Sequence, residues 1–123
     1  MNENVDCRSR VLEILELIAD GQAQSRYQER VPYVDVAAEL FNQWDESYYP
    51  DDAEFCSQFS SGELAAMNAF ALLVVAIADA TPQQLPSLDE FMKTAEWQRL
   101  AAGARLALAS MNIRWRNGLT APR

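Results

Sequence analysis

A strongly apolar stretch, Leu64 to Ala78, constrains the fold of this chain more than any other feature. It is 15 residues long, contains Asn68 as its one polar residue, and is flanked by Glu63 and Asp79. Wound into a helix, it places apolar side chains on every face, and such a helix must be covered on most sides. A transmembrane helix needs about 20 apolar residues. The stretch therefore predicts a buried central helix, over about residues 62–80, and an interface between two copies is the alternative.

Two capping-box patterns predict where helices begin. In Ser60-Ser61-Gly62-Glu63 the serine hydroxyl is expected to accept from the glutamate N–H, while the glutamate carboxylate accepts from the serine N–H. Ser87-Leu88-Asp89-Glu90 repeats the pattern after a loop with two prolines, which prevent the first helix from continuing. We expect the second helix to break near Thr94 and to end near Met111.

Helical periodicity extends through the rest of the chain, and strand alternation is nearly absent. One apolar stripe comprises Val11, Ile14, Leu15 and Ile18, and another comprises Val36, Leu40, Trp44 and Tyr48. Residues 22–30 are polar and fit either a linker or a short helix. Residues 51–59 favour a short helix. We predict an all-α bundle of four to five helices, in one domain over residues 1–123, with a basic tail at 112–123 that frays at its end.

The charge balance and the missing histidines exclude several classes of function. The 123 residues hold 18 acids and 10 bases, a net charge of −8, whereas a general nucleic-acid binder needs a surplus of cations. No histidine is available as a metal ligand or general base, and two cysteines are too few for a zinc site or a disulfide framework. The four glycines are isolated and form no phosphate-binding loop. We therefore predict a protein that is not an enzyme and that uses no metal or cofactor.

The N-terminal residues bear on the cellular compartment. Residues 1–6 are acidic and lack the basic-then-apolar plan of a secretory signal. Together with an apolar stretch too short for a membrane span, they predict a soluble, cytoplasmic protein that does not contact membranes. Cys7 and Cys56 are then expected to be reduced thiols.

The acidic residues are concentrated in one segment. Residues 31–92 contain 11 acids and no lysine or arginine, and seven of these acids lie between Asp35 and Glu54. Six of the twelve aromatic residues lie in the same region: Phe41, Trp44, Tyr48, Tyr49, Phe55 and Phe59. Such a segment favours a surface that attracts a cationic partner. The alternatives are a solvated acidic face and ion pairs with the arginines of the terminal helices.

Tyr48 and Tyr49 are neighbours, so both cannot face inward on a helix. At least one is expected to expose its ring and hydroxyl next to carboxylates and just before the rigid Pro50. An exposed tyrosine in such a place is typical of an interface hot spot. The alternative is a partly exposed tyrosine that closes a loop.

The segment Asp45-Glu46-Ser47-Tyr48-Tyr49-Pro50 resembles the Asp-x-x-Tyr-Tyr-Pro segment of the colicin DNase immunity proteins. Those are small, acidic, four-helix cytoplasmic proteins that bind a basic bacterial nuclease and block it. The resemblance implies that Asp45, Tyr48 and Tyr49 belong to a recognition site.

From these observations we predict a non-enzymatic protein that binds a basic partner protein, in the manner of an immunity-type inhibitor of a bacterial toxin or nuclease. The predicted partner-binding residues are Asp45, Glu46, Tyr48, Tyr49, Asp51, Asp52 and Glu54. A structural or oligomerising helical module, with a homodimer formed through an apolar helix face, is the alternative. Asn68 is expected to bond to another helix or to a buried water, and a ligand pocket around it is a third reading.

Overall fold

The computed structural model describes residues 7–80 and 87–120, with side chains through Met111 in the second range. Within these residues there are seven helices and no strand, which confirms the all-α prediction. The helices are α1 (Cys7–Ala19), α2 (Gly21–Arg30), α3 (Val36–Ser47), α4 (Ala53–Cys56), α5 (Ser61–Ala80), α6 (Leu88–Phe91) and α7 (Ala95–Thr120). Five are long enough to form the bundle, while α4 and α6 are single turns.

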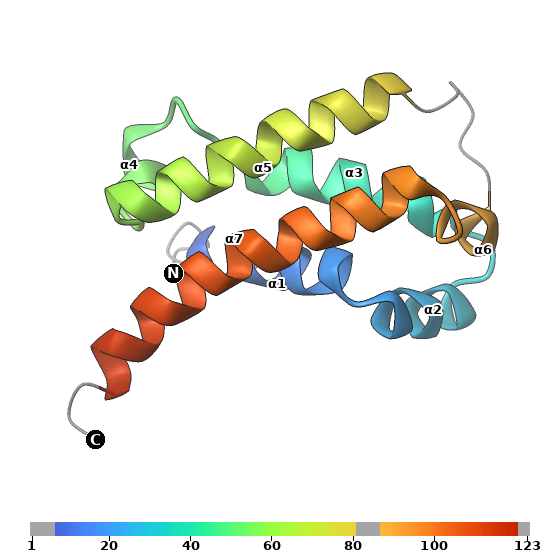
Figure 1. The fold of residues 1–123 in the computed structure, drawn as a ribbon, viewed down its shortest axis with the longest axis horizontal. Coiled ribbons are helices and arrows are strands. Elements are labelled where there is room, and N and C mark those ends of the chain that lie inside the picture. The colour runs from blue at the N-terminus through green and yellow to red at the C-terminus, as the bar shows by residue number, and fades with distance from the viewer. Residues whose placement is uncertain (1–6, 81–86, 121–123) are drawn as a thin grey trace.

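The bundle is built around the pairing of α1 with α7 (Figure 1). Helix α5 packs along α7 in the opposite direction, and α3 packs on the other side of α1. The core between these helices holds fully buried side chains from each of them, among them Leu15, Leu40, Met67 and Leu100. The stripes predicted on α1 and α3 therefore face the core, apart from Tyr48, which is half-buried.

Residues 22–30, left open between a linker and a helix, form most of α2. The Asp20 carboxylate accepts from the N–H groups of Gln22 and Ala23, which caps the helix. Gln24 is fully buried, and its Nε2 donates to the carbonyls of Leu17 and Ile18 at 2.9 and 3.0 Å. The side chain thereby satisfies carbonyls at the end of α1.

Both capping boxes are confirmed at their serines. The Ser60 hydroxyl accepts from the Glu63 N–H at 3.1 Å, and the Glu63 carboxylate accepts from the Ser60 N–H at 2.9 Å. The Ser87 hydroxyl accepts from the Glu90 N–H at 3.3 Å, although Glu90 is exposed and its carboxylate lies 3.8 Å from the Lys93 ammonium. Each serine satisfies an N–H in the first turn of its helix, where helical partners are missing.

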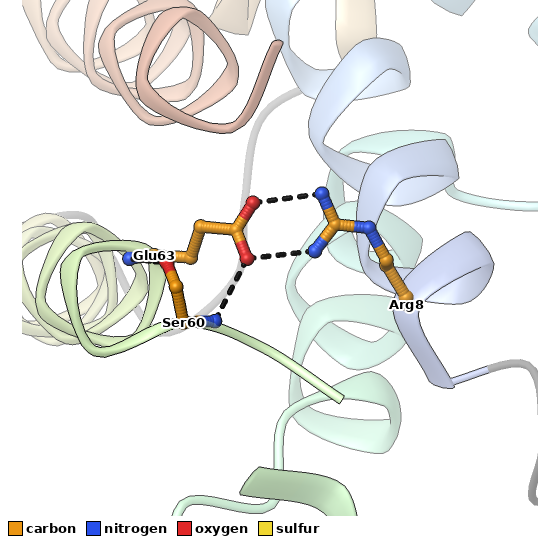
Figure 2. A network of polar contacts seen from close by, with 3 residues as sticks. All are labelled: Arg8, Ser60 and Glu63. Carbon is orange, nitrogen blue, oxygen red and sulfur yellow. Dashed lines mark hydrogen bonds and ion pairs between the residues drawn. The ribbon is translucent and has the colours of Figure 1, made fainter. Parts of the chain in front are cut away.

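Figure 2 shows that Arg8 joins the first capping box. Its two guanidinium nitrogens donate to the two oxygens of Glu63, both at 2.7 Å. The Glu63 side chain is 3% exposed and that of Arg8 is 25% exposed. This bidentate pair ties the first turn of α1 to the first turn of α5.

The break expected near Thr94 is present. Helix α6 ends at Phe91, and α7 begins at Ala95 with the Thr94 hydroxyl accepting from the Trp97 N–H at 3.1 Å. Helix α7 then continues to Thr120, past the end expected near Met111, so that most of the predicted tail at 112–123 has helical backbone. Residues 121–123 lie outside the described part of the chain.

The expectation that α5 is covered on most sides is wrong. Its buried residues, Glu63, Met67, Phe70, Val74 and Ile77, form a single stripe. Leu72 and Val75 on the opposite side are 65% and 58% exposed, and Asn68 is exposed as well. Among the described residues, Asn68 therefore has no hydrogen bond to another helix and does not lie in a buried pocket. α5 lies at the edge of the bundle, not at its centre (Figure 1).

Candidate protein-binding surface

The predicted site residues lie together where α3 ends and α4 begins. We call residues 45–54 the acidic corner. Asp45 and Glu46 occupy the last turn of α3, Tyr48 is its C-cap, and Asp52 is the N-cap of α4. The Asp52 N–H donates to the Tyr49 carbonyl at 3.2 Å, and the Asp52 carboxylate accepts from the Glu54 N–H at 3.0 Å. The chain therefore turns tightly between the two helices (Figure 1).

An aromatic floor supports this turn. The Tyr48 ring stacks on the buried Trp44 with a centroid distance of 4.9 Å, and its other neighbour is Phe55, edge-on at 6.0 Å. Tyr49 meets the same Phe55 edge-on at 6.1 Å, and Phe55 packs on Phe59 at 4.9 Å. Phe55 and Phe59 are both buried, as the expected short helix requires. Contacts of this kind fix ring positions beyond what burial alone achieves.

The two neighbouring tyrosines differ in exposure, as predicted. Tyr48 is half-buried, whereas Tyr49 is 47% exposed. Burial of Tyr48, with smaller contributions from the charges of Cys56 and Asp51, raises its pKa above 10.0. Its hydroxyl is therefore protonated at neutral pH and available as a hydrogen-bond donor.

All five carboxylates of the corner are exposed: Asp45, Glu46, Asp51, Asp52 and Glu54. Among the side chains that the structure describes, none of them forms an ion pair with a lysine or arginine. Arg8 forms its ion pair with Glu63, which lies outside the corner. For the described side chains, the alternative of neutralisation by terminal arginines is therefore not found, and the corner keeps its negative potential.

The position of Asp45 and Glu46 at the end of α3 makes their negative charges unfavourable in a second way, besides their mutual repulsion. The last turn of α3 contains no basic residue. Carboxylates at the C-terminal end of a helix oppose its macrodipole, whose negative end they face, at a cost of about 0.3–1 kcal/mol each. A cation brought to this point would relieve both the dipole repulsion and the mutual repulsion of the carboxylates.

One supporting residue was not expected from the sequence. The Cys56 thiol donates to the Pro50 carbonyl at 3.2 Å and so fastens α4 to the turn. The spacing of six residues between Pro50 and Cys56 matches no recognisable sequence motif. Asp35 and Glu39, the other two acids of the segment, belong to the start of α3, where Asp35 caps the helix, and are not part of the corner.

Neither a known relative nor a cluster of metal-ligating side chains in the described residues points to another kind of site. No known protein family matches the chain, and no curated protein or solved structure is significantly similar to it. Across residues 7–80 and 87–111, no three cysteine or acidic side chains are grouped so that they could hold a metal ion. Of the helices in the described part of the chain, α5 is long and apolar enough to cross a membrane, judged by length and composition alone.

Proposed function

We propose that this protein binds a basic partner protein at the acidic corner. The observation that carries the proposal is the set of five exposed carboxylates in the same turn as Tyr49, none of which forms an ion pair with a described lysine or arginine, above the aromatic floor. Close carboxylates repel one another, and this cost is recovered when a cationic surface docks. The same field speeds the encounter with a basic partner.

Tyr49 is the expected anchor of the interface. Its ring is half-exposed and held edge-on by Phe55, so that little side-chain freedom is lost on binding. Tyrosines placed in this way are enriched among residues that dominate binding energy. The surrounding carboxylates, Asp45 and Asp51 among them, would form the polar rim.

The most specific form of the proposal is an immunity-type inhibitor. The resemblance of residues 45–50 to the colicin DNase immunity proteins supports it, because Asp45, Tyr48 and Tyr49 fall together in the corner. The partner would then be a basic bacterial toxin, such as a nuclease, whose active surface the corner covers. The inhibitor needs no catalytic group for this role.

A capture experiment with purified components tests the proposal. The protein is immobilised, basic proteins retained from an extract of the source cells are identified, and each is purified for titration calorimetry at several salt concentrations. The corner variant combines Asp45→Asn, Tyr49→Ala and Asp51→Asn. We expect it to bind at least about 100-fold more weakly than the wild type, because it removes the anchor and two charges.

A matched control separates the corner from general charge and surface effects. The control variant combines Glu13→Gln, Glu16→Gln and Tyr33→Ala, three exposed residues outside the corner, and it loses the same charge and one tyrosine. It should bind like the wild type. Equal binding by both variants would contradict the proposal, as would the absence of any retained basic protein.

A further inference from the structure

Two arginines without an acidic partner lie on α2, at the opposite end of the bundle from α4 and the acidic corner (Figure 1). Arg26 and Arg30 are four residues apart, so they lie on the same side of the helix, where like charges repel each other. Both are exposed, and neither forms an ion pair with an acid among the described residues. An anion bound between the two guanidinium groups would remove this repulsion.

The two arginines line an open cavity between α1, α2 and α3, which we call the α2 cavity. Its volume is about 590 Å³, within the range of sites for small molecules. The other residues that line it are Leu17, Ala23, Tyr27, Glu29 and Gln43. Leu17, Ala23 and the ring of Tyr27 supply apolar surface, so the cavity has both a cationic side and an apolar side.

Contacts inside the α2 cavity restrain its polar groups. The Arg30 guanidinium lies over the Tyr27 ring, with its central carbon 5.9 Å from the ring centroid. Gln43 Nε2 donates to the Tyr27 hydroxyl at 3.4 Å. A hydroxyl that accepts this bond can still donate its own proton, and among the described residues that proton has no acceptor. Groups that are ordered before binding lose less conformational freedom when a ligand binds.

The charges that line the α2 cavity indicate the class of anion it can hold. Two arginines and one glutamate, Glu29, leave a single net positive charge. Glu39 does not line the cavity, but its carboxylate accepts from Gln43 Nε2 at 3.3 Å and adds negative potential nearby. A ligand with one negative charge therefore matches the cavity better than a phosphate monoester with two.

We propose that the α2 cavity binds a small monocarboxylate with an apolar or aromatic body. The carboxylate accepts from the guanidinium groups of Arg26 and Arg30 and from the Tyr27 hydroxyl. The body of the ligand packs on Leu17 and Ala23. Arginine suits this role because its planar fork of donors matches the two oxygens of a carboxylate.

An NMR titration followed at the backbone amide signals tests the proposal, because it detects weak binding at individual residues. Phenylpropionate, added up to about 10 mM at constant ionic strength, should shift the signals of Ala23, Tyr27 and Gln43 in a saturable way. Two probes with a similar body test the charge. Phenylethylammonium, a cation, and phenyl phosphate, with a second negative charge, should each bind at least about tenfold more weakly.

Substitutions in the lining test which groups hold the carboxylate. Arg30→Gln should raise the dissociation constant of phenylpropionate at least about tenfold, because a charge-assisted hydrogen bond is lost. Tyr27→Phe keeps the ring and should raise it at least about threefold. The matched control is Arg99→Gln, which removes the same charge at an exposed position of α7 and should bind like the wild type. Circular dichroism checks that all three variants fold.

Arg26 also borders a neighbouring cavity, together with Arg105 of α7. Arg105→Gln therefore distinguishes the two cavities and should leave the dissociation constant unchanged. Four results would overturn the proposal: no saturable shift with phenylpropionate, equal affinity for phenylethylammonium, tighter binding of phenyl phosphate, or a loss of binding in Arg105→Gln and not in Arg30→Gln. The α2 cavity and the acidic corner share no residue, so failure of one proposal does not decide the other.

Discussion

The indole N–H of Trp97 donates to the side-chain carbonyl of Gln24 at 2.9 Å, in a buried contact between α7 and α2. The amide of Gln24 donates in turn to two carbonyls of α1. One glutamine thus connects three helices, and every polar atom of its side chain has a partner. A fully satisfied network of this kind fixes the relative positions of the helices, which apolar contacts alone do less strictly.

Replacing this glutamine should therefore destabilise the fold. Gln24→Leu has a similar size but leaves the Trp97 N–H and the carbonyls of α1 without partners, so the free energy of unfolding should fall by about 1–3 kcal/mol. Urea denaturation measures the change. Trp97→Phe should make the additional effect of Gln24→Leu smaller, because the unsatisfied indole is then gone. If the changes in the free energy of unfolding of the two single variants simply add in the double variant, Gln24 and Trp97 are not energetically coupled through this hydrogen bond.

The Arg8–Glu63 pair gives a second prediction about stability. Arg8→Ala removes both guanidinium hydrogen bonds from the buried carboxylate of Glu63 and should lower the free energy of unfolding by about 3 kcal/mol, since removal of one member of a buried ion pair is strongly destabilising. Adding Glu63→Gln should recover part of the loss, because a neutral amide can still accept from the Ser60 N–H. Thermal and urea unfolding measure both variants. A double variant less stable than Arg8→Ala would argue against this explanation.

The raised pKa of Tyr48 predicts a pH dependence at the alkaline end. The folded state holds the phenol proton more tightly than the unfolded state does, so this contribution is fully present below pH 10.0 and is lost as the pH rises through the folded-state pKa. Ultraviolet titration of tyrosinate follows the ionisation, and urea unfolding at several pH values follows the stability. Tyr48→Phe should remove a phenol whose pKa lies above its ordinary value. Loss of an early-titrating phenol in Tyr48→Phe would contradict the assignment.

Gly103 predicts a steric limit where α5 crosses α7. A Cβ atom at this position would lie far inside van der Waals contact with Leu73. Gly103→Ala should therefore destabilise the protein by up to about 2 kcal/mol despite the better helix propensity of alanine, because overpacking exceeds that gain. Gly62→Ala is the matched control, since its Cβ would approach no atom closer than 4.0 Å. Differential scanning calorimetry compares the two, and equal melting temperatures would refute the steric limit.

Local patterns predicted the helices well because their causes lie within a few residues. The Ser60 capping box, the break at Thr94 and the division of Tyr48 from Tyr49 all depend on neighbours in sequence. Periodicity could not reveal the burial of Gln24, whose partner Trp97 lies 73 residues away. It also could not tell which sides of α5 are covered, since an all-apolar helix has no preferred face and the other helices decide its position.

The predicted corner was recovered as a cluster for the same local reason. Its carboxylates and tyrosines occupy ten consecutive residues, so a single turn brings them together. The thiol of Cys56 and the opposition between the α3 dipole and Asp45 could be recognised only once the ends of the helices were known.

The aromatic floor is assembled almost entirely from its own stretch of chain, through Trp44, Tyr48, Phe55 and Phe59. Apart from Asp52, which caps α4, the exposed carboxylates above it contribute little to that packing. The other four can therefore be exchanged one at a time, while the helices below keep their sequence. A surface built in this way allows its charges to change independently of the scaffold that carries them.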